Sequence, residues 1–344
     1  MFAEKVLSGM RPTGRLHLGH YHGVLANWIK LQHDYPCLFF VADWHALTTA
    51  YDEPGTITQN ARDMVIDWLA AGVDPDKATI FVQSMVPEHA ELHLLLSMMT
   101  PLPWLERVPT YKDQQEKLTH KDLTTYGFLG YPLLQSVDIL IYRANKVPVG
   151  EDQVPHIEFT REIARRFNFL YGQTGRKLPD GEPDLKHILV EPGALLTEAS
   201  KMPGLDGQKM SKSYGNTIGL REDEASIRKK IKTMRTDPQR VRRTDAGDPE
   251  KCPVWPLHQI YSNDEVRAWV QQGCRSAGIG CIECKQPVIN GVLAEQVPMH
   301  ERARRYEENP QLVKDILAAG CERASKLARE TMRDVRAAIG LNYE

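Results

Sequence analysis

Two polar stretches of the sequence hold side chains that could bind a polyphosphate. The first, GRLHLGHYHG at residues 14–23, places His17, Gly19 and His20 between a predicted strand and a predicted helix. Imidazole N–H groups and the backbone N–H groups at a helix start both bind anions, and glycine lets a ligand approach the backbone closely. Alone, this stretch fits a plain glycine turn equally well, and a zinc site would need further ligands nearby.

The second stretch, GQKMSKSYGN at residues 207–216, places Lys209 and Lys212 in a polar loop with two serines. Two ammonium groups in a loop can close on the phosphates of a nucleotide, although a solvated lysine-rich loop is the ordinary alternative. The occurrence of both stretches in one chain favours a phosphate site built from the two together.

Four of the six cysteines fall within one segment, with the spacing C-x21-C-x6-C-x2-C; they are Cys252, Cys274, Cys281 and Cys284. Four thiolates can hold zinc or an iron–sulfur cluster, and both remain open beside four unrelated free thiols. A disulfide framework is not expected in a cytoplasmic protein. Cys37 and Cys321 lie in apolar patterns typical of the core.

The elements that must position these groups follow from hydrophobic periodicity. In the first half, short apolar runs alternate with helical patterns, which predicts an α/β fold with a Rossmann-like doubly wound parallel sheet. The expected strands are 5–10, 36–43, 78–84, 135–142 and 187–192, and the expected helices are 22–32, 58–72 and 156–168. A proline-containing connecting segment, about 100–130, interrupts the alternation. After about residue 220 the pattern is helical, including 311–340.

Composition supports a globular chain. The sequence has 344 residues, 42% apolar content and a net charge of −2, and no apolar run is long enough to span a bilayer. We therefore expect a soluble, cytoplasmic protein of two domains, without a signal peptide or membrane association.

These motifs carry a family resemblance. HLGH resembles the HIGH signature of class I aminoacyl-tRNA synthetases, and residues 209–213 match their KMSKS signature. Within that class the chain resembles bacterial tryptophanyl-tRNA synthetases over essentially its whole length, through SGMRPTGRLHLGHY, YPLLQSVDILIY, VPVGEDQVPHIEFTREIARRFN and KMSKSYGNTI. The resemblance implies a Rossmann-like catalytic domain, 1–218, and a C-terminal helical tRNA-binding domain, 219–344, with a cysteine insert at 252–284.

The implied reaction is activation of tryptophan by ATP to tryptophanyl-adenylate, followed by transfer to tRNA(Trp). The attacking carboxylate is already an anion, so catalysis should depend on positioning and phosphate stabilisation, with Mg²⁺ arriving on ATP. The implied catalytic residues are His17, His20, Lys209 and Lys212. The implied ATP contacts are Arg11, Pro12, Thr13, Gly19, His20, Gly150, Glu151, Asp152, Met202, Lys209, Met210, Ser211, Lys212 and Ser213. Arg11 and His20 stand where many relatives have glutamine and asparagine.

The resemblance also assigns a tryptophan pocket, with Asp138, Gln135, His45 and Gln153. A buried Asp138 carboxylate could accept the indole N–H, which can only donate. A tyrosine hydroxyl can donate as well, so a tyrosine-specific enzyme remains an alternative, as does a regulatory paralogue that no longer charges tRNA.

Some bacterial members of the family carry a [4Fe-4S] cluster on a similar cysteine spacing, so the resemblance favours this cluster over zinc. It also implies a homodimer. The segment 227–244 contains eight lysines or arginines and one acid, which is typical of a surface that contacts the phosphate backbone of RNA.

Overall fold

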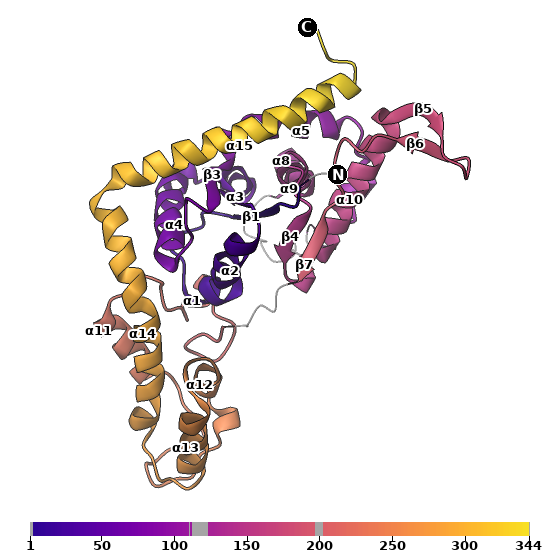
Figure 1. Cartoon of the computed structure of the whole chain (residues 1–344). Helices are drawn as coiled ribbons and strands as arrows, with labels where there is room; N and C mark the ends of the chain where they lie inside the picture. The colour runs from indigo at the N-terminus through magenta and orange to yellow at the C-terminus, as the bar shows by residue number, and fades with distance from the viewer. Residues whose placement is uncertain (1–2, 110, 112–122, 197–201, 344) are drawn as a thin grey trace.

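A five-stranded parallel sheet forms the centre of the computed structural model, which describes residues 3–109, 111, 123–196 and 202–343 (Figure 1). The strands lie in the order β3-β2-β1-β4-β7, and every neighbouring pair is parallel. Their bounds are β1 (Val6–Met10), β2 (Cys37–Val41), β3 (Ala78–Val82), β4 (Lys146–Val149) and β7 (Gly193–Leu196). The predicted α/β fold with a Rossmann-like doubly wound parallel sheet is confirmed.

Helices cover both faces of this sheet. Those of the first half are α1 (Leu18–His20), α2 (Ala26–Asp34), α3 (Asp43–Ala50), α4 (Ile57–Ala71), α5 (Glu88–Ser97), α6 (Leu102–Glu106), α8 (Tyr126–Leu129), α9 (Tyr131–Leu140) and α10 (Val154–Tyr171). A π-helical turn, η1 (Tyr21–Leu25), joins α1 to α2. The C-terminal part contains α11 (Glu224–Thr233), α12 (Trp255–Tyr261), α13 (Asp264–Arg275), α14 (Cys281–Glu308) and α15 (Pro310–Ala338).

Alternate residues of the strands build two separate cores. Phe39 and Ile80 face one side, where they join a core with Trp28 of α2 and Trp68 of α4. Their neighbours along the strands belong to a second core with residues of α5, α9, α10 and α15. Because successive side chains of a strand point to opposite faces, almost continuously apolar strands are what a sheet covered on both faces requires.

Two predicted strands are wrong. Residues 135–142 lie mostly in α9, which is buried on nearly every side and therefore lacks the polar face that marks a helix in sequence. Residues 187–192 form no strand; instead, the N–H groups of Ile188 and Leu189 donate to the side chain of Asn168, at 2.9 and 3.0 Å. The side-chain amide of Asn168 thus forms the hydrogen bonds with this backbone that a neighbouring strand would otherwise form. The sheet is completed by β4 and β7, which the pattern did not predict.

The helical expectations agree better with the structure. The predicted helices at 22–32, 58–72, 156–168 and 311–340 correspond to η1 with α2, to α4, to α10 and to α15. Of the connecting segment, α6 and α8 are described, whereas residues 110 and 112–122 lie outside the described residues. No helix of the described ranges is long and apolar enough to cross a membrane.

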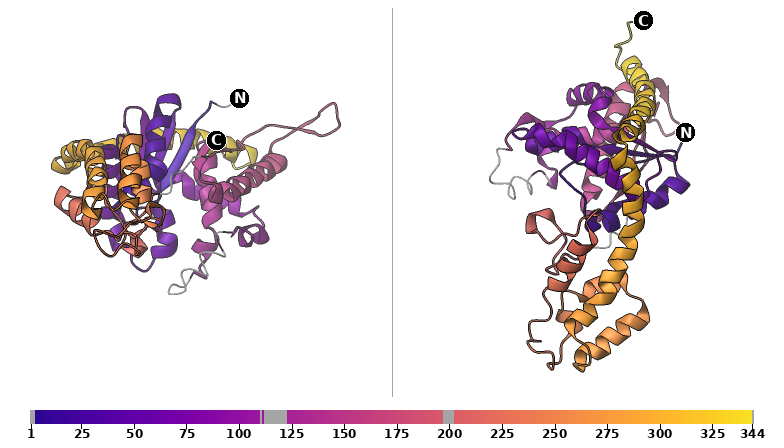
Figure 2. Two further views of the ribbon diagram at one scale, coloured as in Figure 1. Left: turned by 90° about the horizontal axis from the view of Figure 1, so that it is seen from below. Right: turned by 90° about the vertical axis from the view of Figure 1, so that its left-hand side faces the viewer.

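The C-terminal helix α15 covers the outer edge of β3, at the top of Figure 1. A Cβ on Gly320 would lie 1.7 Å from the carbonyl oxygen of Ile80, so only glycine permits this approach. The N–H of Val82 donates to Cys321 Sγ at 3.5 Å. The helix thereby protects an otherwise open sheet edge. Figure 2 shows α14 extending from the N-terminal end of α15, away from the sheet and toward α12 and α13.

Candidate active site

The HLGH motif forms the short helix α1 and its N-cap, and a loop connects β1 to this helix. His17 is its N-cap residue, and its Nδ1 accepts a hydrogen bond from the N–H of Gly19 at 3.1 Å. The Nδ1 of His20 accepts from the N–H of His17 at 3.2 Å. Since both Nδ1 atoms accept, each neutral ring carries its proton on Nε2 and offers an N–H donor there.

Both rings are neutral at physiological pH. Burial, together with the nearby Lys212 charge, lowers the pKa of His17 to about 4. Burial, followed by the influence of His17 and Lys212, lowers the pKa of His20 to about 3. The ring centroids are 3.9 Å apart, so two imidazolium ions here would repel each other strongly.

The KMSKS segment lies against this motif. A Cβ on Gly19 would lie 2.9 Å from the His17 ring and 3.5 Å from the Cβ of Met210. Lys212 Nζ donates to the carbonyl oxygen of Thr13 at 3.1 Å. The N–H of Leu18 also donates to the oxygen of Ile218, at 3.0 Å. The two signatures, far apart in sequence, therefore lie side by side, and the residues that flank them are joined by hydrogen bonds.

Asn216 and Asp67 hold these loops in place. Asn216 Oδ1 accepts from the N–H of Ser211 at 2.8 Å, and its Nδ2 donates to Asp206 Oδ1 at 2.7 Å. Buried Asp67 of α4 accepts from the N–H of Leu16 and from Arg221 Nε, at 3.1 and 2.5 Å. Sequence spacing gave no indication of either residue.

A cavity of about 540 Å³ opens beside α1 at the carboxyl ends of β1 and β4. Eight of the predicted site residues line it: Arg11, His20, His45, Gln135, Asp138, Gly150, Asp152 and Gln153. His17 and Lys212 line an adjacent cavity of about 450 Å³. Residues predicted for ATP and residues predicted for tryptophan therefore share one space.

The remaining predicted residues line neither cavity; they are Pro12, Thr13, Gly19, Glu151, Met202, Lys209, Met210, Ser211 and Ser213. Met202 and Met210 are buried, and the N–H of Met210 donates to the Met202 oxygen at 3.0 Å. Lys209 and Ser213 are exposed. Contact of any of the predicted residues with ATP or tryptophan stays a prediction.

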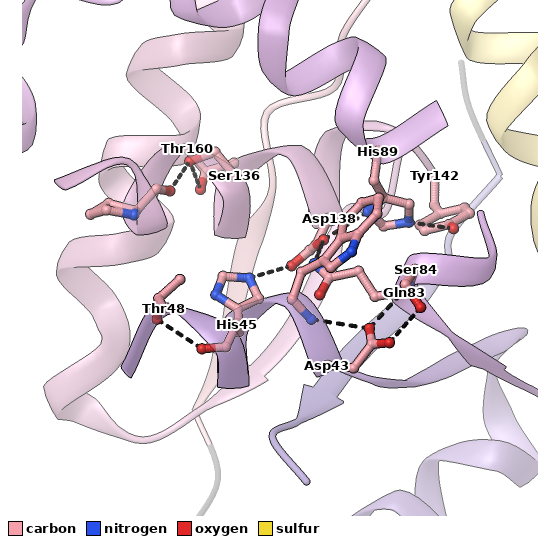
Figure 3. Close-up of polar contacts among 12 residues, drawn as sticks. Asp43, His45, Thr48, Gln83, Ser84, His89, Ser136, Asp138, Tyr142 and Thr160 are labelled. Carbon is pink, nitrogen blue, oxygen red and sulfur yellow. Dashed lines mark hydrogen bonds and ion pairs between the residues drawn. The ribbon is translucent and has the colours of Figure 1, made fainter. Parts of the chain in front are cut away.

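Asp138 lies at the floor of the shared cavity and accepts hydrogen bonds from three side chains (Figure 3). His45 Nε2 lies 2.8 Å from Oδ2, while Gln83 Nε2 and His89 Nδ1 lie 2.7 and 2.8 Å from Oδ1. The other ring nitrogen of His89, Nε2, lies 2.7 Å from the hydroxyl oxygen of Tyr142. Gln83, His89 and Tyr142 were not identified from sequence, because nothing in their local pattern marks them.

This network keeps Asp138 ionised. Burial alone would raise the pKa of the carboxyl group, but the hydrogen bonds from His45 and His89 outweigh it and leave the pKa below its ordinary value. A carboxylate has about four acceptor positions, of which Oδ1 uses two and Oδ2 one. Among the described residues, one acceptor position on Oδ2 has no donor.

The four clustered cysteines come from segments that pack together. Cys252 precedes α12, Cys274 lies in α13, and Cys281 and Cys284 begin α14. Cys284 packs on a small core of Trp255, Val270 and Ile279, and its Sγ lies 3.4 Å from His258 Nε2. Burial, then the charges of the other three thiols, raises the pKa of Cys284 to about 12. Within the described ranges, no three histidine, cysteine or acidic side chains are arranged as ligands of a metal ion.

The basic segment 227–244 is less uniform than its sequence indicates. Lys230 pairs with Glu222 at 2.6 Å, and Arg228 pairs with Glu224 at 2.7 Å. Arg240 is buried and faces Cys274. The exposed cations without a described carboxylate partner are Lys229, Lys232, Arg235, Arg242 and Arg243.

Comparison with known proteins agrees with this geometry. Residues 3–292 match the family of tRNA synthetases class I (W and Y). The chain is 61% identical to the tryptophan–tRNA ligase of Ralstonia nicotianae, with all of both chains covered. It is 50% identical to that of Thermotoga maritima, covering 98% of this chain and 100% of the relative.

Among solved structures, tryptophanyl-tRNA synthetase from Campylobacter jejuni, complexed with ADP and tryptophan, superposes with a TM-score of 0.85. It is 31% identical, and the match covers 98% of this chain and 99% of that one. The matches extend over both signatures, the shared cavity and the C-terminal helices. The chain therefore belongs to the class I tryptophanyl-tRNA synthetases.

Proposed function

We propose that this tryptophan–tRNA ligase binds tryptophan and ATP side by side in the 540 Å³ cavity and joins them as tryptophanyl-adenylate. One observation carries the proposal: His20, Gly150 and Asp152, proposed for ATP, line the same cavity as Asp138 and His45, proposed for tryptophan. A shared cavity lets the amino-acid carboxylate reach the α-phosphorus directly.

This reaction requires the protein mainly to position the two substrates and to stabilise the charge of the phosphates. The tryptophan carboxylate attacks the α-phosphorus, the bond to the bridging oxygen breaks, and pyrophosphate leaves with its electrons. Neutral His17 and His20 can donate Nε2–H to phosphate oxygens, and the ammonium group of Lys212 can balance the developing charge. Mg²⁺ enters with ATP, held mainly by phosphate and water oxygens.

We assign tryptophan selection to the vacant acceptor position of Asp138. An indole N–H would fill that position, whereas phenylalanine would leave it unpaired in a buried site. The three donors from His45, Gln83 and His89 fix the carboxylate so that it cannot turn away. Gln135 and Gln153 also line the cavity and are proposed to contact the bound amino acid.

Residues 219–344 are proposed to bind tRNA(Trp), and 1–218 to perform activation. The exposed cations Lys229, Lys232, Arg235, Arg242 and Arg243 suit the phosphate backbone of RNA, which supplies affinity more than identity. Because its substrates are ATP and tRNA, we propose that the enzyme works in the cytoplasm.

We propose that Cys252, Cys274, Cys281 and Cys284 hold a [4Fe-4S] cluster, with zinc as the alternative. Four cysteine sulfurs suit either metal centre, and these four lie near enough to influence one another's pKa. The neighbouring cations Arg240 and Lys285 suit thiolates. Anaerobically purified protein should show broad visible absorption with about four irons per chain. A colourless protein with stoichiometric zinc would replace the cluster by zinc.

A homodimer is proposed through the apolar surface around α5. Leu94 and Met98, 56% and 74% exposed, follow Ala90 at intervals of four and therefore share its side of the helix. Ala90 lines an apolar cavity of about 430 Å³ with Leu47 and Tyr51. Such a patch is typical of an association surface. Sedimentation equilibrium of the wild type and of Leu94→Asp tests this assignment.

The experiment that tests the function is amino-acid-dependent exchange of pyrophosphate into ATP, with tryptophan, tyrosine and phenylalanine compared on one preparation. Exchange with tryptophan alone is expected. Exchange with tyrosine would keep the chemistry and overturn the pocket assignment, while no exchange by folded protein would indicate a paralogue that does not activate amino acids.

A further inference from the structure

The backbone at His17 is paired with the segment that follows KMSKS. His17 and Gly219 lie opposite each other in an antiparallel bridge. The N–H of Leu18 donates to the oxygen of Ile218 at 3.0 Å, and a second bond of 3.1 Å joins the residues on the other side of the pair. Because these bonds flank the pair, the N–H and the carbonyl group of Gly219 point away from His17. They need partners from elsewhere in the fold.

A glutamine of α14 binds the carbonyl oxygen of Gly219. Gln296 is only 1% exposed, and its Nε2 donates to this oxygen at 2.7 Å. The N–H of Gly219 donates to Glu222 Oε2 at 2.8 Å. Two side chains thus bind the outer edge of the paired segments, where a third strand would otherwise lie.

Gln296 is a costly residue for the interior of the protein. Its Oε1 is buried and has no hydrogen-bond partner among the described residues. Val292 and Met299, one turn before and one turn after it on α14, belong to the apolar core. An apolar side chain would avoid the unpaired oxygen, so packing alone does not account for a glutamine here. What the amide adds is the bond to Gly219.

The helix that carries Gln296 is fixed against the catalytic part of the chain. Arg302, six residues further along α14, donates through Nε to the carbonyl oxygen of Ala70 near the end of α4, at 2.6 Å. Glu295 Oε2 lies 3.1 Å from Nε2 of His22, which belongs to the turn η1 directly after α1. Helix α14 therefore holds the chain at Gly219 and again just beyond HLGH.

We propose that Gln296 is a positioning residue for amino-acid activation, which acts through Gly219 to fix the backbone of His17. The inference rests on the proposed function, in which His17 donates Nε2–H to phosphate oxygen. Gly219, His17 and Lys212 line the same cavity of about 450 Å³, so a shift of Gly219 moves one wall of the phosphate site. Gln296 lines neither this cavity nor the shared one, which leaves it an indirect role.

The test measures single-turnover adenylate formation and, separately, the dissociation constant of tryptophan in variants of the full-length enzyme. Gln296→Met keeps the length of the side chain but removes the donor. Gln296→Asn keeps the amide but withdraws it by one methylene. Gln311→Met is the matched control, because Gln311 is an exposed glutamine of α15 whose Nε2 donates to Asp315 of the same helix, at 2.7 Å.

Gln296→Met should form the adenylate about tenfold more slowly than the wild type, since the loss of one hydrogen bond lets the paired segments shift. The dissociation constant of tryptophan should stay within about twofold, because Asp138 and His45 are untouched. Gln296→Asn should be slow as well, and it decides alone if Gln296→Met does not fold. Gln311→Met should match the wild type.

A double-mutant cycle provides the readout that a merely structural role would not move. His17→Asn keeps a side chain that can cap the helix but removes the Nε2–H donor. If Gln296 acts through His17, adding Gln296→Met to His17→Asn should slow the reaction by less than about twofold further.

Three results would overturn the inference. A wild-type rate in both Gln296 variants would make the bond to Gly219 irrelevant to activation. A further tenfold loss on top of His17→Asn would show that Gln296 acts elsewhere than through His17. A parallel loss of tryptophan affinity would indicate a general loosening of the fold. Failure of the proposed function would look different, because the wild type itself would then form no adenylate with tryptophan.

Discussion

His45 and Asp138 lie 93 positions apart in the chain, yet His45 Nε2 is 2.8 Å from Asp138 Oδ2. This contact joins α3 to α9 at the floor of the shared cavity. Since the carboxylate accepts, His45 must donate from Nε2. The histidine therefore occupies one acceptor position of Oδ2 and holds the carboxylate in a fixed orientation.

Replacement of Asp138 by alanine should weaken tryptophan binding by about 10- to 100-fold, the usual worth of a hydrogen bond to a charged group. ATP binding should change by less than about threefold. Calorimetric titration with each ligand separately checks this expectation. The melting temperature of the variant should fall as well, because His45, Gln83 and His89 would lose their common hydrogen-bond acceptor. Equal losses for both ligands would remove Asp138 from the indole pocket.

Gly19→Ala should slow adenylate formation by about 100-fold, with little effect on tryptophan affinity. The new Cβ would lie 2.9 Å from the His17 ring, so the ring must move and its Nε2–H would be misdirected. Pre-steady-state measurement of adenylate formation provides the test. Gly55→Ala is the control, because a Cβ there meets nothing within 4 Å. A normal rate in Gly19→Ala would mean that the ring orientation is unimportant.

Lys212→Ala should reduce the rate of adenylate formation by about 100-fold, as removal of one charge-stabilising donor typically does. Tryptophan affinity should remain within about twofold, because Lys212 lines the cavity next to the shared one. Lys229→Ala, which removes an exposed lysine of α11, is the matched control for charge. An unchanged activation rate in Lys212→Ala would contradict a phosphate-binding role for this lysine.

Stability should fall as the pH drops below about 6.5. Burial lowers the pKa of His17 and His156 to about 4 and that of His20 to about 3. The unfolded chain therefore takes up these protons first, and the folded state loses relative stability from pH 6.5 down to those values. Each histidine contributes a slope of up to about 1.4 kcal/mol per pH unit in that window.

Urea unfolding at pH 7.5, 6 and 5 measures this slope before most carboxyl groups titrate. His156→Gln should flatten the curve, since one of the buried histidines with a lowered pKa is removed from the linkage. A free energy of unfolding that stays constant from pH 7.5 to 5 would show that these rings are protonated as easily in the folded protein as in the unfolded chain.

Local sequence patterns correctly predicted those elements that depend only on the spacing of nearby residues, such as amphipathic helices. The amphipathic α4, α10 and α15 follow from their apolar stripes, and α4 ends at Gly72, whose φ of 120° suits only glycine. The pattern of residues 135–142 predicts a strand where the structure has the buried helix α9, because an element covered on nearly all sides has no polar face to set its period. Strand β4 is short and contains Pro148, so its sequence carries little signal.

By itself the sequence determined the two signatures, the cysteine spacing and the doubly wound fold, which follow from residue types and their intervals, whereas Asp138 was predicted only through the family resemblance. Only the tertiary structure decided which of these groups meet and in what state. Gln83, His89 and Tyr142 have no sequence signal, because they come from the turn after β3, from α5 and from the end of α9, and only folding brings them together around Asp138. Arg240 lies in a segment that looks like an exposed basic surface, and only folding shows that it is buried beside a sulfur atom.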